Sequence, residues 1–131
     1  MRISTLADAA QVPAKTIRYY EEIGLLAPSL RTANGYRHYQ AKDIDRLVFI
    51  RRCRELNISI DDIKQLLDVQ QHPKASCAAV DNIIAKQLAR VQQTQRELAL
   101  LENSLHQLAT SCTHQQIEDC TILQQLRHTP R

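Results

Sequence analysis

The sequence of 131 residues is poor in glycine and in aromatic residues, with two glycines, one phenylalanine and no tryptophan. This composition argues against a chain built from many short strands and tight turns, so we expect mainly helices. No apolar run is long enough to span a bilayer, and polar residues and Asp8 interrupt the N-terminus where a secretory signal would be apolar. We therefore expect a cytoplasmic protein with no membrane partner.

The charge of the chain is small in sum but uneven along it. A formal net charge of +3 does not identify a nucleic-acid binder by itself. Residues 1–54, however, hold ten lysines and arginines against five acidic residues. A basic N-terminal half is what a phosphate-binding surface requires.

Two short helices with a tight connection are predicted at the N-terminus. Thr5 and Asp8 stand at capping-box spacing, and the segment QVP interrupts this first helix. A second helix follows in PAKTIRYYEEIG, where Pro13 suits the first turn and Gly24 the C-terminal cap. Together they form a helix-turn-helix candidate. The second helix carries donors and an aromatic ring of the kind that contact bases and phosphates: Lys15, Thr16, Arg18 and Tyr19. For this helix alone, a tyrosine packed in the core beside merely solvated charges explains the pattern equally well.

A hairpin is predicted directly after these helices. In LRTANGYRHYQ, the pair Asn34-Gly35 is a strong signal for a two-residue turn. A small β-ribbon after a helix-turn-helix is a wing, and this one is basic and aromatic through Arg31, Tyr36 and Arg37. A basic hairpin alone is also compatible with an ordinary surface loop. A recognition helix followed by a wing indicates DNA binding more specifically than either part.

A second pair of helices is predicted in AKDIDRLVFIRRCRELN and SIDDIKQLL, which have apolar residues at helical spacing. Ser59 and Asp62 occupy capping-box positions at the start of the latter. Cys53 has apolar neighbours in the former, so we interpret it as a core residue.

A long helix is predicted after the break at Pro73. Its apolar residues repeat every seven positions at Ile84, Val91, Leu98 and Leu105, with Val80, Leu101 and Leu108 on the companion position and Gln87 and Thr94 as polar interruptions. This is a coiled-coil pattern over about four heptads. No second long helix exists in the sequence to cover the stripe, so we expect the partner to be another copy in a homodimer.

Three of the four cysteines flank this helix, with Cys77 before it and Cys112 and Cys120 after it. At ~1.5 Å per residue, Cys77 and Cys112 are about 50 Å apart in one helix, so their thiols cannot meet within one chain. Disulfides are rare in the cytosol. Metal binding, redox sensing and simple burial are therefore the interpretations that the cysteines allow.

The segments TIRYYEEIGLL, NGYRHY and RLVFIRRCRELNISIDDIKQLL, with the long helix and its terminal cysteines, resemble the MerR family of transcriptional regulators over nearly the whole chain. The resemblance implies an all-α fold with a small β-hairpin wing. A winged helix-turn-helix DNA-binding domain would span residues 1–70, a linker and antiparallel dimerisation coiled coil 71–110, and a metal-binding loop and C-terminal segment 111–131. It also implies a homodimer on double-stranded promoter DNA that distorts the DNA so that RNA polymerase contacts both promoter elements.

The same resemblance implies where a metal would bind. In an antiparallel dimer the start of one long helix meets the end of the other, so Cys77 approaches Cys112 of the partner subunit and Cys120 of the partner subunit. Three thiolates suit Cd²⁺ or Pb²⁺, with Hg²⁺ or Zn²⁺ as further candidates. The family's copper and silver sensors have Ser at the position of Cys77, and its zinc sensors have an extra Cys where this chain has Thr113. His114 is expected to be a solvated loop residue. The stretches SCAAVDNII and CTILQQL look most like the cadmium/lead-responsive branch, and the resemblance implies that efflux or detoxification genes are the targets.

Other classes remain open from the sequence. The same fold sensing Hg²⁺, Zn²⁺ or Cu⁺, a redox-responsive or non-metal transcription factor, and a metal buffer without a DNA role are the alternatives. An enzyme is the least favoured class, since no nucleophile–base pair or glycine-rich phosphate loop stands out.

Overall fold

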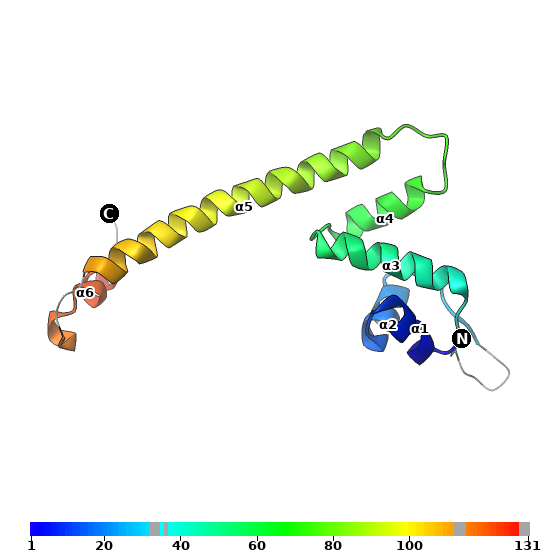
Figure 1. The fold of residues 1–131 in the computed structure, drawn as a ribbon, viewed down its shortest axis with the longest axis horizontal. Coiled ribbons are helices and arrows are strands. Elements are labelled where there is room, and N and C mark those ends of the chain that lie inside the picture. Colours follow the sequence, from blue (N-terminus) through cyan, green and yellow to red (C-terminus); the bar gives the residue numbers. More distant parts are fainter. Residues whose placement is uncertain (32–34, 36, 112–114, 129–131) are drawn as a thin grey trace. The chain divides into compact units, whose positions relative to one another are not determined.

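The computed structural model describes residues 1–31, 35, 37–111 and 115–128, and the chain is mainly helical, as its composition predicts (Figure 1). It forms two compact units, residues 1–87 and residues 88–131. The first unit contains α1 (Ile3–Ala10), α2 (Ala14–Glu22), β1 (Leu30–Arg31), β2 (Arg37–His38), α3 (Ala41–Glu55) and α4 (Ile60–Val69). Helix α5 (Ala78–Ser111) runs through both units, and the second unit ends with the 3₁₀ turn η1 (Ile117–Asp119) and α6 (Thr121–Arg127). Within the described ranges, no helix is long and apolar enough to cross a membrane.

Helices α1, α2 and α3 all end in the same way. Each is followed by a residue with positive φ, namely Gln11 at 57°, Gly24 at 82° and Asn57 at 58°. The next backbone N–H then donates to the carbonyl five residues earlier, in the pairs Val12 to Ala7 (3.1 Å), Leu25 to Tyr20 (2.9 Å) and Ile58 to Cys53 (3.1 Å). This Schellman arrangement satisfies carbonyls that the helix end leaves open. It also turns the apolar residue that follows each helix into the core, where all three are buried.

The start of α1 differs from its prediction, whereas that of α4 agrees. Helix α1 begins at Ile3, so Thr5 and Asp8 lie within it and not at a capping box. The chain before the helix is fixed by the Tyr39 N–H, which donates to the Met1 carbonyl at 2.8 Å. That contact sets where the helix begins, independently of local capping. In α4, the Asp62 N–H donates to the Ser59 hydroxyl at 3.2 Å, as the spacing predicts.

The core of the first unit collects side chains from all of its helices. Helix α1 packs against both α2 and α3. The buried apolar residues are Leu6, Ala10, Val12, Ile17, Tyr20, Leu25, Leu26, Tyr39, Leu47, Ile50, Cys53, Ile58, Ile63, Leu66, Leu67 and Ile83. Cys53 lies among them, as its apolar neighbours predict, and burial raises the pKa of its thiol. Burial therefore disfavours the thiolate, which is the form that binds metal ions.

The segment after α2 forms a short antiparallel pair of strands. Leu30 of β1 lies opposite His38 of β2, and Arg31 lies opposite Arg37. Gly35 has a φ of 80°, which suits the turn predicted there, while Asn34 lies outside the described residues. The pairing holds the two ends of this segment together between α2 and α3.

The core assignment predicts unequal costs for two equivalent truncations. Leu25→Ala removes a side chain with no exposed surface, so it should lower the free energy of unfolding by ~2–5 kcal/mol. Leu56→Ala, at a leucine that is 61% exposed, should change it by less than about 0.5 kcal/mol. Urea denaturation at one fixed protein concentration measures both. Equal effects of the two substitutions would contradict the core described here.

Candidate nucleic-acid interface and metal-binding cysteines

Helix α2 has one buried side and one polar exposed side. Ile17 and Tyr20 enter the core, whereas Lys15, Arg18 and Tyr19 are exposed and Thr16 is half-buried. Tyr19 is 50% exposed and Tyr20 is 8% exposed, which separates the roles of the two tyrosines. Tyr20 is the core residue, and Tyr19 remains available with the basic side chains. All four residues predicted on this helix are thus at least partly accessible to a ligand.

The strand pair brings two of the predicted wing residues into register. Arg31 and Arg37 are direct cross-strand partners. Tyr36, the third residue predicted here, lies outside the described residues.

Part of the positive charge in the N-terminal half has a structural role. The Arg46 Nε donates to the Leu25 carbonyl at 2.7 Å, and the Arg54 Nη1 donates to the Ile58 carbonyl at 2.7 Å. Arg51 forms an ion pair with Glu55 at 3.4 Å. These arginines stabilise helix ends and loops. Counting lysines and arginines therefore overstates the charge that is available for phosphates.

The two described cysteines of the predicted metal site both stand at helix starts. Cys77 directly precedes α5, its carbonyl accepts the Asp81 N–H at 2.9 Å, and its side chain is exposed. Cys120 is the N-cap residue of α6, its carbonyl accepts the Gln124 N–H at 3.1 Å, and its side chain is half-buried. Cys112 and the neighbouring Thr113 and His114 lie outside the described residues.

A metal site is not completed by the described part of a single chain. Among residues 1–31, 35, 37–111 and 115–128, no group of three His, Cys, Asp or Glu side chains is placed to hold a metal ion. Cys77 belongs to the first compact unit and Cys120 to the second. As a donor set, three thiols suit a soft metal ion. Their convergence across two chains stays a prediction.

The apolar residues of α5 divide into two groups. In the first unit, Ile83 is buried, Val80 packs against the core, and the Gln87 Nε2 donates to the Leu56 carbonyl at 3.0 Å. Ile84, Val91, Leu98, Leu101 and Leu105 remain exposed. The heptad pattern assigned Val80 and Gln87 to the coiled-coil stripe and missed Ile83. Val80, Ile83 and Gln87 are spaced by three and then four residues, and this spacing was the signal for a second stripe at the start of the helix.

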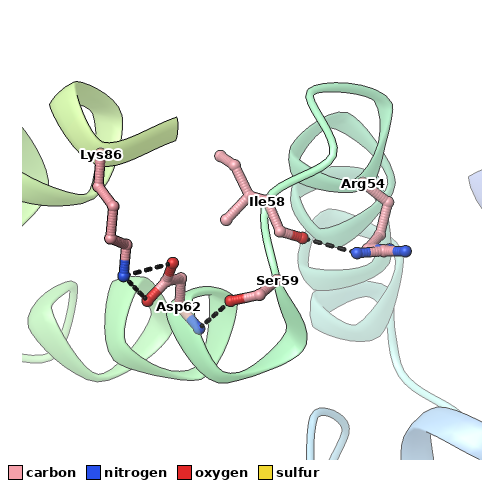
Figure 2. Close-up of polar contacts among 5 residues, drawn as sticks. All are labelled: Arg54, Ile58, Ser59, Asp62 and Lys86. Carbon is pink, nitrogen blue, oxygen red and sulfur yellow. Dashed lines mark hydrogen bonds and ion pairs between the residues drawn. The ribbon is translucent and has the colours of Figure 1, made fainter. Parts of the chain in front are cut away.

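One ion pair that the sequence did not reveal joins α4 to α5. The Lys86 Nζ lies 3.0 Å from each carboxylate oxygen of Asp62 (Figure 2). Asp62 is one of the few buried charged residues of the described chain, while Lys86 is half-exposed. The partners are separated by 24 positions, so no helical periodicity relates them.

Comparison with known families agrees with this arrangement. Residues 1–70 match the family described as MerR HTH family regulatory protein. Residues 44–108 match the family described as MerR, DNA binding. The chain belongs to the MerR family.

Relatives of this MerR chain match it over nearly its whole length. The HTH-type transcriptional regulator CueR of Vibrio cholerae is 35% identical over 127 residues, which cover 97% of this chain and 91% of the relative. The structure of the regulator PbrR691 of Ralstonia metallidurans in complex with lead(II) has a TM-score of 0.87 at 36% identity, covering 96% of this chain and 98% of that one. The structure of the regulator MerR of Bacillus megaterium with mercury(II) has a TM-score of 0.73 at 31% identity, covering 98% and 100%. All three are transcriptional regulators, which confirms the prediction that this chain is not an enzyme.

We expect residues of the exposed side of α2 and of the strand pair to contact DNA. Arg18→Ala should weaken binding to a cognate promoter fragment by ~1–3 kcal/mol if Arg18 reads a base, because a bidentate base contact is lost. Arg37→Ala should mainly reduce the salt dependence of binding, by a slope of about 1, if Arg37 contacts phosphate. Arg90→Ala removes the same charge from α5 and serves as the control. Fluorescence anisotropy over a salt series measures all three, and unchanged binding by both Arg18→Ala and Arg37→Ala would disprove the assignment.

Proposed function

We propose that this chain is a metal-responsive transcriptional regulator that binds promoter DNA as a homodimer and activates metal efflux or detoxification genes. The effector is Cd²⁺ or Pb²⁺, held by Cys77, Cys112 and Cys120. The observation that carries the proposal is the exposed thiol of Cys77 at the start of a 34-residue helix whose apolar stripe is exposed. In this view residues 1–70 bind DNA, 71–110 form the linker and dimerisation helix, and 111–131 contribute the remaining metal ligands.

DNA binding is assigned to α2 and to the strand pair. The exposed donors Lys15, Arg18 and Tyr19 stand on one short helix, so they can enter a major groove together. Arg31 and Arg37 are paired positions of the wing, and arginine is a residue type that contacts phosphates. Thr16 on α2 and Tyr36 in the wing complete the proposed contact set.

Dimerisation is assigned to the exposed stripe of α5. Ile84, Val91, Leu98 and Leu105 repeat every seven residues and are all at least 42% exposed. A repeat of this kind buries its apolar surface against another helix of the same kind. We propose an antiparallel pairing of two copies, because it places the Cys77 end of one helix beside the Cys112 and Cys120 end of the other.

Metal binding is assigned to three sulfur atoms from two subunits. Three thiolates around a divalent ion match soft cations that prefer more than two ligands. The relatives in complex with lead(II) and mercury(II) support a soft divalent effector. When bound, such an ion supplies a cross-link between the helix start that carries Cys77 and the segment of the partner that carries the other two thiols.

Activation would act through the shape of the DNA. A regulator of this kind reads a promoter whose central base pairs are deformed, so the energy of bending and untwisting contributes to control. The two DNA-binding units of the dimer would change their mutual rotation when the metal binds. RNA polymerase then contacts both promoter elements, without a contact between the regulator and the central bases.

A second candidate is a two-sulfur site formed by Cys112 and Cys120 alone. Linear coordination by two thiolates suits Cu⁺ or Hg²⁺. The mercury(II) complex of a relative is compatible with either candidate, since three thiolates also suit Hg²⁺. In that case Cys77 would be an exposed residue without a role in the response, and its removal separates the two candidates.

The dimer is tested by charges placed in the stripe. The double substitution Leu98→Asp and Leu105→Asp should raise the dimer dissociation constant by at least about tenfold, equivalent to ~1.4 kcal/mol, because four carboxylates would have to be buried. Leu100→Asp changes a leucine that is 70% exposed and lies off the repeat, so it should leave the dimer intact. Sedimentation velocity over a concentration series distinguishes the variants. An intact dimer in the double variant would show that the stripe has been misread.

The metal site is tested by removing Cys77. Cys77→Ser should still fold, dimerise and bind the promoter but lose its response to Cd²⁺ and Pb²⁺, since two sulfurs remain where these ions prefer more ligands. Cys53→Ser should keep the response, because Cys53 is a core residue. Transcription from the target promoter across a panel of metals is the measurement. A full Cd²⁺ response in Cys77→Ser would contradict the three-sulfur site, whereas a Cu⁺ or Hg²⁺ response that survives in this variant would favour the two-sulfur site.

Mixed dimers test whether the site lies between subunits. One subunit carries Cys77→Ser, and the other carries Cys112→Ser with Cys120→Ser. Antiparallel packing then leaves one complete three-sulfur site and one empty site per dimer. Absorption of the Cd²⁺–thiolate bond in purified heterodimers reports the stoichiometry, and no three-sulfur site at all would refute the proposed geometry.

A further inference from the structure

The first turns of α5 are attached to the corner between the end of α3 and the first turn of α4, residues 56–62, by Ile83 and by the two residues Lys86 and Gln87 that follow it. Ile83 itself is only 3% exposed and belongs to the core of the first unit. Lys86 follows one turn later and contacts Asp62 in the first turn of α4 (Figure 2). The next residue, Gln87, contacts the Leu56 carbonyl at the end of α3. The attachment therefore combines one apolar contact with two polar ones of different chemistry.

Gln87 completes the end of α3. The last carbonyls of a helix have no partner within the helix and need one from elsewhere. The Cys53 and Arg54 carbonyls accept hydrogen bonds from backbone N–H groups of the corner, and the Ile58 carbonyl accepts one from the Arg54 side chain. The Leu56 carbonyl accepts the Gln87 Nε2 at 3.0 Å. Helix α5 thus supplies part of the cap of α3.

Lys86 neutralises a carboxylate at the start of α4. Asp62 lies in the first turn of α4, and its side chain is only 11% exposed. Removing a carboxylate from water is costly unless a cation or hydrogen-bond donors compensate it. Lys86 contributes that compensation from α5, with Nζ at 3.0 Å from both oxygens. A displacement of α5 along its axis would withdraw the cation from a largely buried anion.

We propose that the Asp62–Lys86 ion pair and the Gln87–Leu56 hydrogen bond form the joint that couples α5 to the DNA-binding helices. Any movement of the start of α5 must either break both contacts or carry the α3–α4 corner with it. Cys77 lies nine residues before Lys86, about 13 Å along one helix. A ligand that displaces Cys77 therefore acts on the segment that holds the corner. This role rests on the proposed function.

Lys86→Met is the substitution that tests the joint. Methionine keeps the length and packing of the lysine stem but removes the charge from Asp62. Arg90→Met is the matched control, since it removes one positive charge one turn further along the same exposed helix surface. Lys86→Arg restores the cation. If Lys86→Met does not fold, Gln87→Met replaces it in the same measurements, because it removes the hydrogen bond to the Leu56 carbonyl.

Three quantities are measured on each purified full-length protein. They are the Cd²⁺ affinity, the promoter affinity without metal, and the ratio of transcription with Cd²⁺ to transcription without it. In Lys86→Met we expect this ratio to fall by about twofold or more relative to Arg90→Met, while both affinities stay within about twofold. Lys86→Arg should regain the ratio.

The remaining outcomes each decide against the joint. A ratio in Lys86→Met that stays within about twofold of Arg90→Met shows that the pair does not couple the helices. A fall in the ratio that follows a lost affinity, or that Lys86→Arg does not reverse, shows a purely structural role. An unaltered protein whose transcription ignores the whole metal panel overturns the proposed function, and the coupling role with it.

Discussion

The burial of Ile83 in the core of the first unit is the contact on which the organisation of the chain depends. It fixes the first turns of α5 to α3 and α4, so the rest of the helix extends from a folded base. The apolar stripe that begins at Ile84 has nothing to cover it within the described part of the chain. One helix therefore has an anchored segment and an open segment. The first contributes Ile83 to the core of the first unit, and the second leaves its apolar stripe exposed.

The positively charged side chains also fall into two groups. Some stabilise the fold, and others remain available to bind a ligand. Arg46 and Arg54 cap backbone carbonyls, and Lys86 compensates Asp62. The exposed Lys15 and Arg18 on α2 have no such role in the described structure. An electrostatic argument for DNA binding thus rests on where the cations stand, and the modest net charge of +3 is no obstacle to it.

Local signals predicted much of the fold, and contacts distant in sequence account for the rest. Gly24 and the Ser59–Asp62 spacing marked a helix end and a helix start correctly, because capping depends on residues within one turn. The start of α1 was wrong, since a contact between Met1 and Tyr39 determines it. Gln87 appeared as an interruption of the heptad, whereas its amide caps α3. On α2, residue type singled out Lys15, Thr16, Arg18 and Tyr19, but the sequence left open which tyrosine is in the core. It also could not give Asp62 its partner across 24 positions.

The position of Cys77 connects the anchored segment with the proposed effector. Its carbonyl accepts a hydrogen bond in the first turn of α5, so a movement of the Cys77 backbone moves that turn. The next turns contain Ile83 and Lys86, which hold the α3–α4 corner. If metal binding at Cys77 changes promoter affinity through this segment, then promoter binding changes metal affinity by the same factor, because the coupling free energy is a property of the pair of sites. In the proposed arrangement, the contacts of Ile83, Lys86 and Gln87 would carry this coupling over the few turns after Cys77, without requiring the metal to contact the DNA-binding helices.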